Sequence, residues 1–321
     1  MKVPRRVLPA ITLAHPAAAR AQGWPARPVR LIIPFPPGGG LDALGRAIAE
    51  RVSAATGQPV VVDNRPGGST VPGVDAVAKA APDGHTLLMT ADNSITSNPL
   101  LIPGLPHDPI RDLAPVSFLL ETHQMVVAHP RLGVRGIPAL IEAARTQRLN
   151  YGSYGQASQP HLLFGALGAQ AGVEFTEIPY RGLTPAVLAT VAGEVDLTLC
   201  GIASAGEHLA AGTLRALAVG RAERLPQLPD VPTLAESGHG DVDPRTWFGL
   251  FAPGATPAEL LSRIHAQVAA AMADPALVRR FLTPNGYTVH TATPEASRAL
   301  IAADLDYKRG LMRRAGLNPA P

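Results

Sequence analysis

The sequence contains one pattern twice, an apolar strand followed by a glycine-rich turn and a helix, and this repeat constrains the fold most. In the first copy, the apolar stretch Val29 to Phe35 precedes three consecutive glycines at 38–40. In the second copy, Leu149 to Ser153 leads into a Gly/Ser-rich turn at 152–158, followed by an apolar helix. Alternating strands and helices are typical of α/β proteins. The sequence therefore predicts an α/β fold with two similar lobes.

The distribution of charge excludes one class of partner. The formal net charge of +3 depends on the first 21 residues, which hold basic residues and no acidic ones. No run of Lys or Arg follows them, and aromatic residues make up only 4% of the chain. The basic patch and the stacking platforms of a nucleic-acid binder are therefore not expected.

The N-terminus has the pattern of a signal peptide. Basic residues come first, Val7 to Ala14 is apolar, and Ala19-Arg20-Ala21 fits a small-x-small cleavage site before Gln22. Residues 1–21 are thus predicted to be a targeting segment. The alternative is a frayed Ala-rich tail. No apolar run reaches the ~18 residues that a membrane-spanning helix needs.

Each glycine-rich turn is a candidate anion site. A turn that opens a helix directs backbone N–H groups and the positive end of the helix dipole at one point, without any basic side chain. If the two lobes face each other, both turns face one cleft. The alternative is that the glycines only permit two tight turns.

Several other kinds of chemistry are not expected. The turns have neither the P-loop nor the G-x-G-x-x-G spacing, so no nucleotide cofactor is predicted. Cys200 is the only cysteine and lies in an apolar stretch, which indicates a buried thiol and excludes a disulfide within the chain. The histidines are scattered without H-E-x-x-H, so no metal site is predicted. A hydrolase that uses Ser153 or Ser158 with His161 and Asp196 stays open as an alternative, although Tyr151 stands where a G-x-S-x-G elbow needs glycine.

Motifs along the chain identify a family resemblance. The chain resembles the extracytoplasmic receptors of tripartite tricarboxylate transporters, the TctC-like or Bug receptors, from about residue 24 to about residue 317. The motifs that carry the resemblance are Pro-Val-Arg-Leu-Ile-Ile-Pro-Phe-Pro-Pro-Gly-Gly with Asp42, Val62-Asp63-Asn64-Arg65-Pro66-Gly67, Pro82-Asp83-Gly84-His85-Thr86, Tyr151-Gly152-Ser153, Tyr180-Arg181-Gly182, Pro229-Asp230-Val231-Pro232-Thr233 and Trp247-Phe248-Gly249-Leu250-Phe251.

The resemblance implies a two-lobed, type II-like periplasmic-binding-protein fold, in which each lobe is a mixed sheet flanked by helices and the ligand lies between the lobes. We expect one lobe to contain residues 22–124 and 245–321 and the other to contain 125–244. The Pro-rich stretch Leu225 to Asp243 is expected to be extended. The resemblance also implies a monomeric receptor, without enzymatic activity, that delivers a small organic carboxylate to membrane permease subunits. A ligand sensor for a signalling partner is the alternative within this fold.

The resemblance also implies which residues contact the ligand. In the family, backbone amides of the two turns cradle a carboxylate. Three further positions are predicted from their place in the chain. Arg181 could contact a carboxylate or pair with an acid, and Asn93 would read distal atoms. Asp196 could meet an amino group or water, or pair with Arg181. The complete predicted set is Phe35, Pro37, Gly38, Gly39, Asp42, Asn93, Ser153, Gly155, Ala157, Ser158, His161, Arg181 and Asp196.

Two positions depart from the family pattern. Leu41 stands before Asp42, where a small hydroxyl residue is usual, and this predicts a preference for a less polar acid. Ala157 stands where glycine is usual in the second turn. Because alanine tolerates a positive φ poorly, that turn is expected to differ slightly.

Overall fold

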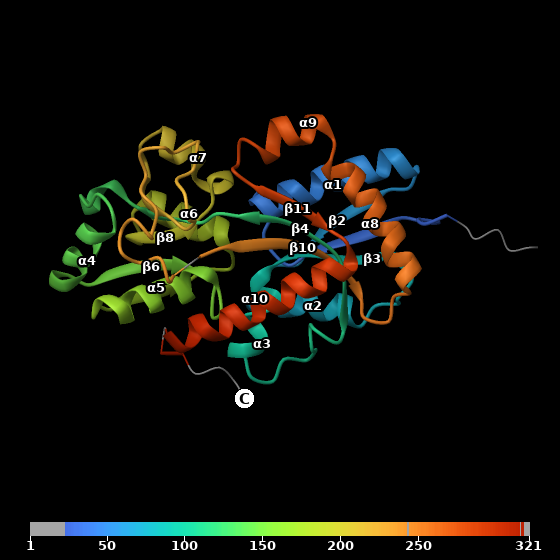
Figure 1. Ribbon diagram of the computed structural model, residues 1–321, viewed down its shortest axis with the longest axis horizontal. Coiled ribbons are helices and arrows are strands. Elements are labelled where there is room, and N and C mark those ends of the chain that lie inside the picture. The colour runs from blue at the N-terminus through green and yellow to red at the C-terminus, as the bar shows by residue number, and fades with distance from the viewer. Residues whose placement is uncertain (1–22, 243, 315, 318–321) are drawn as a thin grey trace, which may run out of the picture.

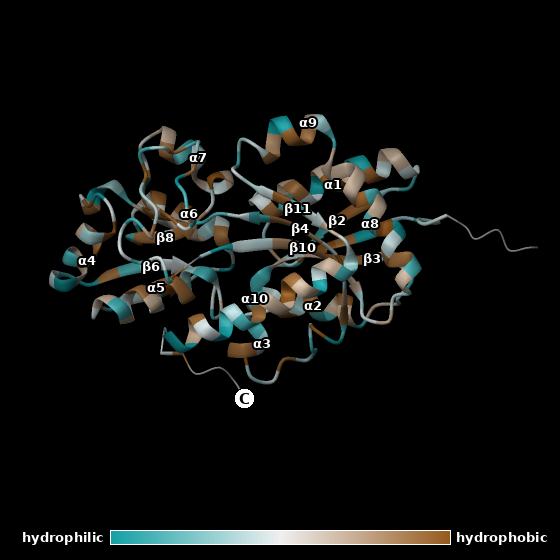
Figure 2. Ribbon diagram, viewed as in Figure 1, coloured by the Kyte–Doolittle hydropathy of each residue, from teal (hydrophilic) through white to brown (hydrophobic). Residues whose placement is uncertain are grey.

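A computed structural model describes residues 23–242, 244–314 and 316–317, and it shows an α/β protein of two lobes (Figure 1). The predicted signal peptide, residues 1–21, lies outside the described residues. Hydrophobic stretches lie within the strands and helices of both lobes (Figure 2). Within the described part of the chain, no helix is long and apolar enough to cross a membrane.

The first lobe contains a mixed six-stranded sheet of order β11-β4-β10-β3-β1-β2. β1 pairs in parallel with β2 and β3, whereas β10 and β11 pair antiparallel to their neighbours. Its strands are β1 (Val29–Ile33), β2 (Val60–Asn64), β3 (Thr86–Ala91), β4 (Leu113–Thr122), β10 (Thr246–Pro253) and β11 (Thr288–Ala292). Its helices are α1 (Gly40–Thr56), α2 (Val71–Ala78), α3 (Asn98–Leu101), α8 (Ala258–Met272), α9 (Pro275–Leu277) and α10 (Pro294–Arg314).

The second lobe contains a mixed five-stranded sheet of order β7-β6-β8-β5-β9. In this sheet β6 is parallel to its neighbours β7 and β8, whereas β5 is antiparallel to its neighbours β8 and β9. Its strands are β5 (Met125–Ala128), β6 (Leu149–Ser153), β7 (Phe175–Pro179), β8 (Leu197–Cys200) and β9 (Arg215–Val219). Its helices are α4 (Ile137–Thr146), α5 (Gln159–Ala171), α6 (Leu183–Ala192) and α7 (Ile202–Ala210). The parallel strands end on one edge, and the helices α5, α6 and α7 begin there.

The C-terminal helix α10 runs beneath both lobes (Figure 1). Ile301 packs in the core of the first lobe, whereas Leu311 and Met312 pack in the core of the second. The end of α10 thus differs from the prediction that placed all of residues 245–321 in the first lobe. The reason is length, because a helix of 21 residues spans about 30 Å and reaches across the junction.

A buried ion pair lies where the lobes meet. Lys308 Nζ on α10 is 2.8 Å from Asp92 Oδ2, which follows β3, and both side chains are at most 1% exposed. Gln159 Nε2, at the start of α5, donates to the same carboxylate oxygen at 2.6 Å and to the carbonyl oxygen of Arg245 at 2.7 Å. One polar cluster therefore links the first lobe, the second lobe, the C-terminal helix and the segment that enters β10.

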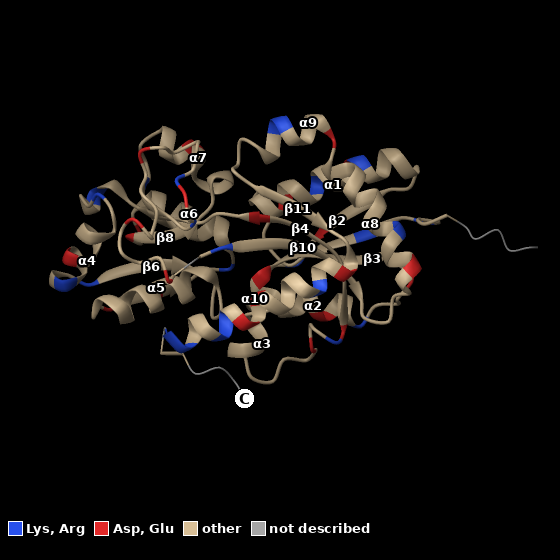
Figure 3. Ribbon diagram, viewed as in Figure 1, with Lys and Arg blue, Asp and Glu red and all other residues tan. Residues whose placement is uncertain are grey.

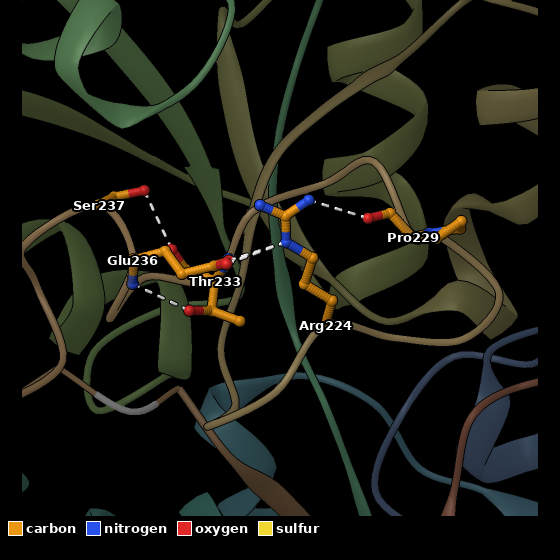
Figure 4. Close-up of polar contacts among 5 residues, drawn as sticks. All are labelled: Arg224, Pro229, Thr233, Glu236 and Ser237. Carbon is orange, nitrogen blue, oxygen red and sulfur yellow. Dashed lines mark hydrogen bonds and ion pairs between the residues drawn. The ribbon is translucent and has the colours of Figure 1, made fainter.

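The Pro-rich stretch between β9 and β10 is held by local polar contacts (Figure 4). Arg224 donates from Nε to the Glu236 carboxylate and from Nη1 to the carbonyl oxygen of Pro229. The Glu236 carboxylate also accepts from the backbone N–H of Thr233, and the Thr233 hydroxyl accepts from the N–H of Glu236. This reciprocal capping fixes a turn without a long helix, and Leu234 beside it enters the core of the second lobe.

Candidate functional site

A pocket lies between the lobes, where the turns after β1 and β8 approach each other. Its first-lobe wall comes from the start of α1 and from β3, β4 and β10, and its second-lobe wall comes from the starts of α6 and α7. It is lined by Phe35, Pro36, Gly39, Gly40, Leu41, Asp42, Ala91, Thr122, Gln124, Tyr154, Leu183, Thr184, Gly201, Ala203, Ser204, Thr246, Phe248 and Tyr287. Three of the predicted ligand residues, Phe35, Gly39 and Asp42, are among them.

Asp42 holds the first glycine turn in shape. Its Oδ2 accepts from the backbone N–H of Gly38 and from Arg46 Nε, both at 3.0 Å, and its Oδ1 accepts from Asn64 Nδ2 at 2.9 Å. Burial acts to raise the pKa of Asp42, but these hydrogen bonds and the Arg46 charge outweigh it, so the pKa lies below its ordinary value. Asp42 is therefore an ionised acceptor that positions the turn, with its lone pairs directed at the protein.

Three helices begin at this pocket, and each has a glycine at its N-cap. The N-caps are Gly39 for α1, Gly182 for α6 and Gly201 for α7, and none of them can supply a side-chain cap. The first N–H groups of a helix have no partner within it, and the helix dipole makes this end positive. Three such ends create a site for an anion without any cationic side chain.

The pocket has no other source of positive charge in its wall. Among the described residues that line it there is no Lys, Arg or His, and Asp42 is the only charged one. Across the rest of the molecule, basic and acidic residues are interspersed over both lobes (Figure 3). The helix ends are thus the feature of this pocket that favours an anion.

The two lobes approach closely enough that glycine is required at the contact. A Cβ atom on Gly182 would lie 2.5 Å from Pro36 Cδ in the opposite turn, and one on Gly40 would lie 3.1 Å from the Cβ of Ala203. Real Cβ atoms hardly ever approach another atom within 3.0 Å. A side chain at position 182 would therefore hold the lobes apart.

The second glycine turn contributes to the pocket differently from the prediction. Tyr154 is its only residue in the wall of this pocket, while Ser153, Ala157 and Ser158 are buried. The Ser153 hydroxyl is 2.5 Å from Glu177 Oε1 and accepts from the N–H of Gly155. At the start of α5, the N–H of Gln159 donates to the Tyr154 hydroxyl at 3.4 Å, so the Tyr154 side chain covers this helix end. The helix ends facing the pocket from the second lobe are those of α6 and α7.

The Ala157 position keeps the backbone that glycine would prefer. Its φ is +63°, in the left-handed region, and its N–H donates to His161 Nδ1 at 3.1 Å. His161 thus supports the turn from behind and is absent from the pocket wall. Ala157 thus adopts the left-handed backbone that favours glycine, at the cost of a strained φ, whereas the sequence predicted a slightly different turn.

Arg181 and Gly155 line a neighbouring pocket at the edge of the interface. Phe35 and Tyr154 line both pockets and form their common wall. The rest of the second pocket is formed by Pro34, Gly67, Gly68, Ser69, Thr70, Tyr180 and Gly182. Arg181 is exposed there, so the predicted basic contact lines this second pocket and is absent from the wall of the first.

Four predicted ligand residues lie elsewhere. Asp196 precedes β8, at the end of the sheet opposite to the pocket, where it pairs with Arg131 at 3.0 Å and accepts from the N–H of Asn150. Asn93 is buried without contributing to either pocket wall, and the exposed Pro37 and Gly38 contribute to neither. The structure thus places Asp196 away from the pocket, because the pocket lies at the carboxyl ends of the parallel strands of the second lobe, whereas Asp196 precedes β8.

The geometry also bears on the alternative chemistries. The Arg131 contact removes Asp196 from any triad with Ser158 and His161. Cys200 is buried, and burial raises the pKa of its thiol to about 12, so it stays a neutral core residue. Among the described residues, no group of His, Cys, Asp and Glu has the arrangement of a metal site.

Sequence reasoning did not find the residues that complete the wall. Gly201, Thr184 and Ser204 start helices, and Gln124 and Thr246 lie where the chain crosses between the lobes. Glycine after the apolar strand 195–200 was the signal that could have identified Gly201, because it repeats the strand–glycine–helix pattern. Thr246 and Gln124 carry no local signal.

Two lobes and an interlobe pocket at glycine-capped helix ends are features of solute-binding receptors. Comparison with known proteins specifies the family: the model of the tripartite tricarboxylate transporter family receptor, TctC, matches residues 44–317. The chain belongs to this family of periplasmic receptors.

Named relatives and solved structures agree with this assignment. The chain is 35% identical over 303 residues to Protein BugT of Bordetella pertussis, covering 94% of this chain and 93% of the relative. The structure of R. palustris Rpa4515 with adipate superposes with a TM-score of 0.88 at 31% identity, covering 92% and 100% of the two chains. MatC from Rhodopseudomonas palustris with bound malate gives a TM-score of 0.85 at 29% identity, covering 90% and 99%.

Proposed function

We propose that this chain is exported to the periplasm, closes its two lobes on a small organic carboxylate and delivers it to the membrane subunits of a tripartite transporter. The observation that carries the proposal is the convergence of three glycine-capped helix ends on one pocket whose wall has no basic side chain. Adipate in one similar structure and malate in another support a carboxylate as the anion.

The glycine contacts support closure as the binding motion. Gly182 approaches Pro36 and Gly39 approaches Thr184 across the interface, so the two lobes touch where the first glycine turn meets the start of α6. A ligand held by helix ends from both lobes stabilises this closed arrangement, because it binds the closed state better than the open one. No bond in the ligand is made or broken.

Binding is tested with the chain from Gln22 onward, unfolded and refolded to remove any co-purified ligand. Thermal unfolding is measured against mono-, di- and tricarboxylates, amino acids and aromatic acids. An acid present at about 100 times its Kd should stabilise the protein by ~2.7 kcal/mol. Mass spectrometry should recover the bound acid unchanged. Stabilisation by no acid, or turnover of the acid, would refute the receptor assignment.

Delivery is tested separately in cells. Deletion of the gene should abolish uptake of the labelled acid that the protein binds, and the wild-type chain should restore uptake. If uptake persists in the deletion strain while a transcriptional response to the acid is lost, the protein serves a sensor instead of a transporter.

A further inference from the structure

The side walls of the pocket are aromatic and aliphatic. Phe35 and Tyr154 meet edge to face across the lobe interface, with ring centroids 6.4 Å apart. Phe248 and Tyr287 form a second edge-to-face pair, with centroids 6.2 Å apart. Leu41 and the aliphatic side chain at position 183 complete the apolar lining. Rings in such pairs present apolar faces and edges on which another ring packs favourably.

The polar groups of the pocket are gathered at one end and at the crossing between the lobes. The Tyr287 hydroxyl lies at the start of α1, 2.5 Å from where a Cβ on Gly40 would be. Burial raises the pKa of both Tyr154 and Tyr287, so their hydroxyls are neutral. The Thr246 hydroxyl is buried, lines the pocket and has no hydrogen-bond partner among the described residues. A buried hydroxyl without a partner indicates a ligand atom that completes it.

One anionic group can be satisfied in this pocket, but a second cannot. The three helix ends serve one carboxylate, and the remaining wall has no cation for another. A second carboxylate placed among the rings would lose its hydration without gaining a counter-charge, which disfavours its binding. The exposed Arg181 lines the neighbouring pocket and does not contribute to the wall of this one.

We propose that the pocket selects a monocarboxylate with an aromatic or otherwise apolar body. Its carboxylate lies at the starts of α1, α6 and α7, its body lies between the Phe35–Tyr154 and Phe248–Tyr287 ring pairs, and the Thr246 hydroxyl meets a polar substituent or a carboxylate oxygen. This inference rests on the proposed receptor function and narrows the substrate class.

Matched pairs of acids test the selection. Isothermal titration of the refolded protein compares benzoate with terephthalate and hexanoate with adipate, because each pair differs by one added carboxylate. We expect the monocarboxylate of each pair to bind at least about tenfold more tightly. Tighter binding of terephthalate or adipate, or equal affinities within both pairs, overturns the inference and leaves the receptor function standing. Binding of none of the wider set of acids overturns the receptor function itself.

Variants test the roles of individual walls. Tyr287→Leu should weaken benzoate binding about tenfold because a ring contact is lost, whereas Phe175→Leu, an aromatic residue of the second lobe outside the pocket, should leave it unchanged. Leu41→Thr should shift the ranking toward more polar acids. Arg181→Gln should leave benzoate affinity unchanged. A large loss on Arg181→Gln, or an unchanged ranking in Leu41→Thr, contradicts the proposed placement.

Discussion

The buried ion pair between Asp92 and Lys308 gives the sharpest prediction about stability. Lys308→Met removes the cation and leaves the Asp92 carboxylate, itself 0% exposed, with Gln159 as its side-chain donor. Removing one partner of a buried pair costs about 3–5 kcal/mol because the other charge loses its compensation. With an unfolding entropy of about 2.1 cal/mol/K per residue, this lowers the Tm of a chain of this length by about 4–7 °C.

The assay is thermal unfolding followed by circular dichroism, with two matched controls. Lys79→Met makes the same substitution in the exposed Asp75–Lys79 pair and should change stability by less than about 1 kcal/mol. The double variant Asp92→Leu/Lys308→Met removes both charges and should recover most of the loss. If Lys308→Met and Lys79→Met behave alike, the buried pair does not stabilise the junction as argued.

The pH dependence of the Lys308→Met variant follows from the same burial. Without Lys308, burial and the nearby Asp304 charge raise the pKa of Asp92 in the folded chain above its value in the unfolded chain. The folded variant then holds a proton that the unfolded chain releases, so its stability falls as pH rises. The loss relative to wild type should be smaller at about pH 5 than at about pH 8. An equal loss at both values would show that Asp92 does not take up the proton.

Three further predictions concern the turns around the pocket. Gly182→Ala should weaken ligand binding at least about tenfold, measured by titration, because its Cβ meets Pro36 when the lobes close; unchanged affinity would mean that the lobes tolerate the added atom. Asp42→Asn should weaken the contact to Arg46 and make the stability of the protein less dependent on acidification. The reason is that the lowered pKa of Asp42 gives stability that is present above about pH 4 and lost as pH falls. Urea titrations at several pH values measure this change. Ala157→Gly should raise the free energy of unfolding by about 1 kcal/mol, since φ is +63° there; a lower stability would refute that account.

The first turn could be predicted from the sequence because its determinants are local. The strand, the glycines, Asp42 and the start of α1 lie within a few residues of one another, so the turn and the helix end that it exposes are both encoded in one motif. The α/β alternation and the two-lobed fold could be predicted for the same reason, and the motifs in register identified the family.

The remaining site depends on which segments meet in space. Asp196 follows a helix and precedes a strand, and only the sheet topology shows that this end faces away from the pocket. The Tyr154 side chain covers the helix end that the turn sequence appeared to offer, so α6 and α7 supply the second-lobe ends instead.

The sequence by itself determined the local units of this protein: strands, glycine turns, helix starts and the apolar faces that require two cores. Tertiary structure alone decided which three helix ends share a pocket, which rings enclose it, and that Lys308 meets Asp92 beneath both lobes. The physical reason is that turn and helix preferences act over a few residues, whereas packing joins residues without regard to their separation along the chain.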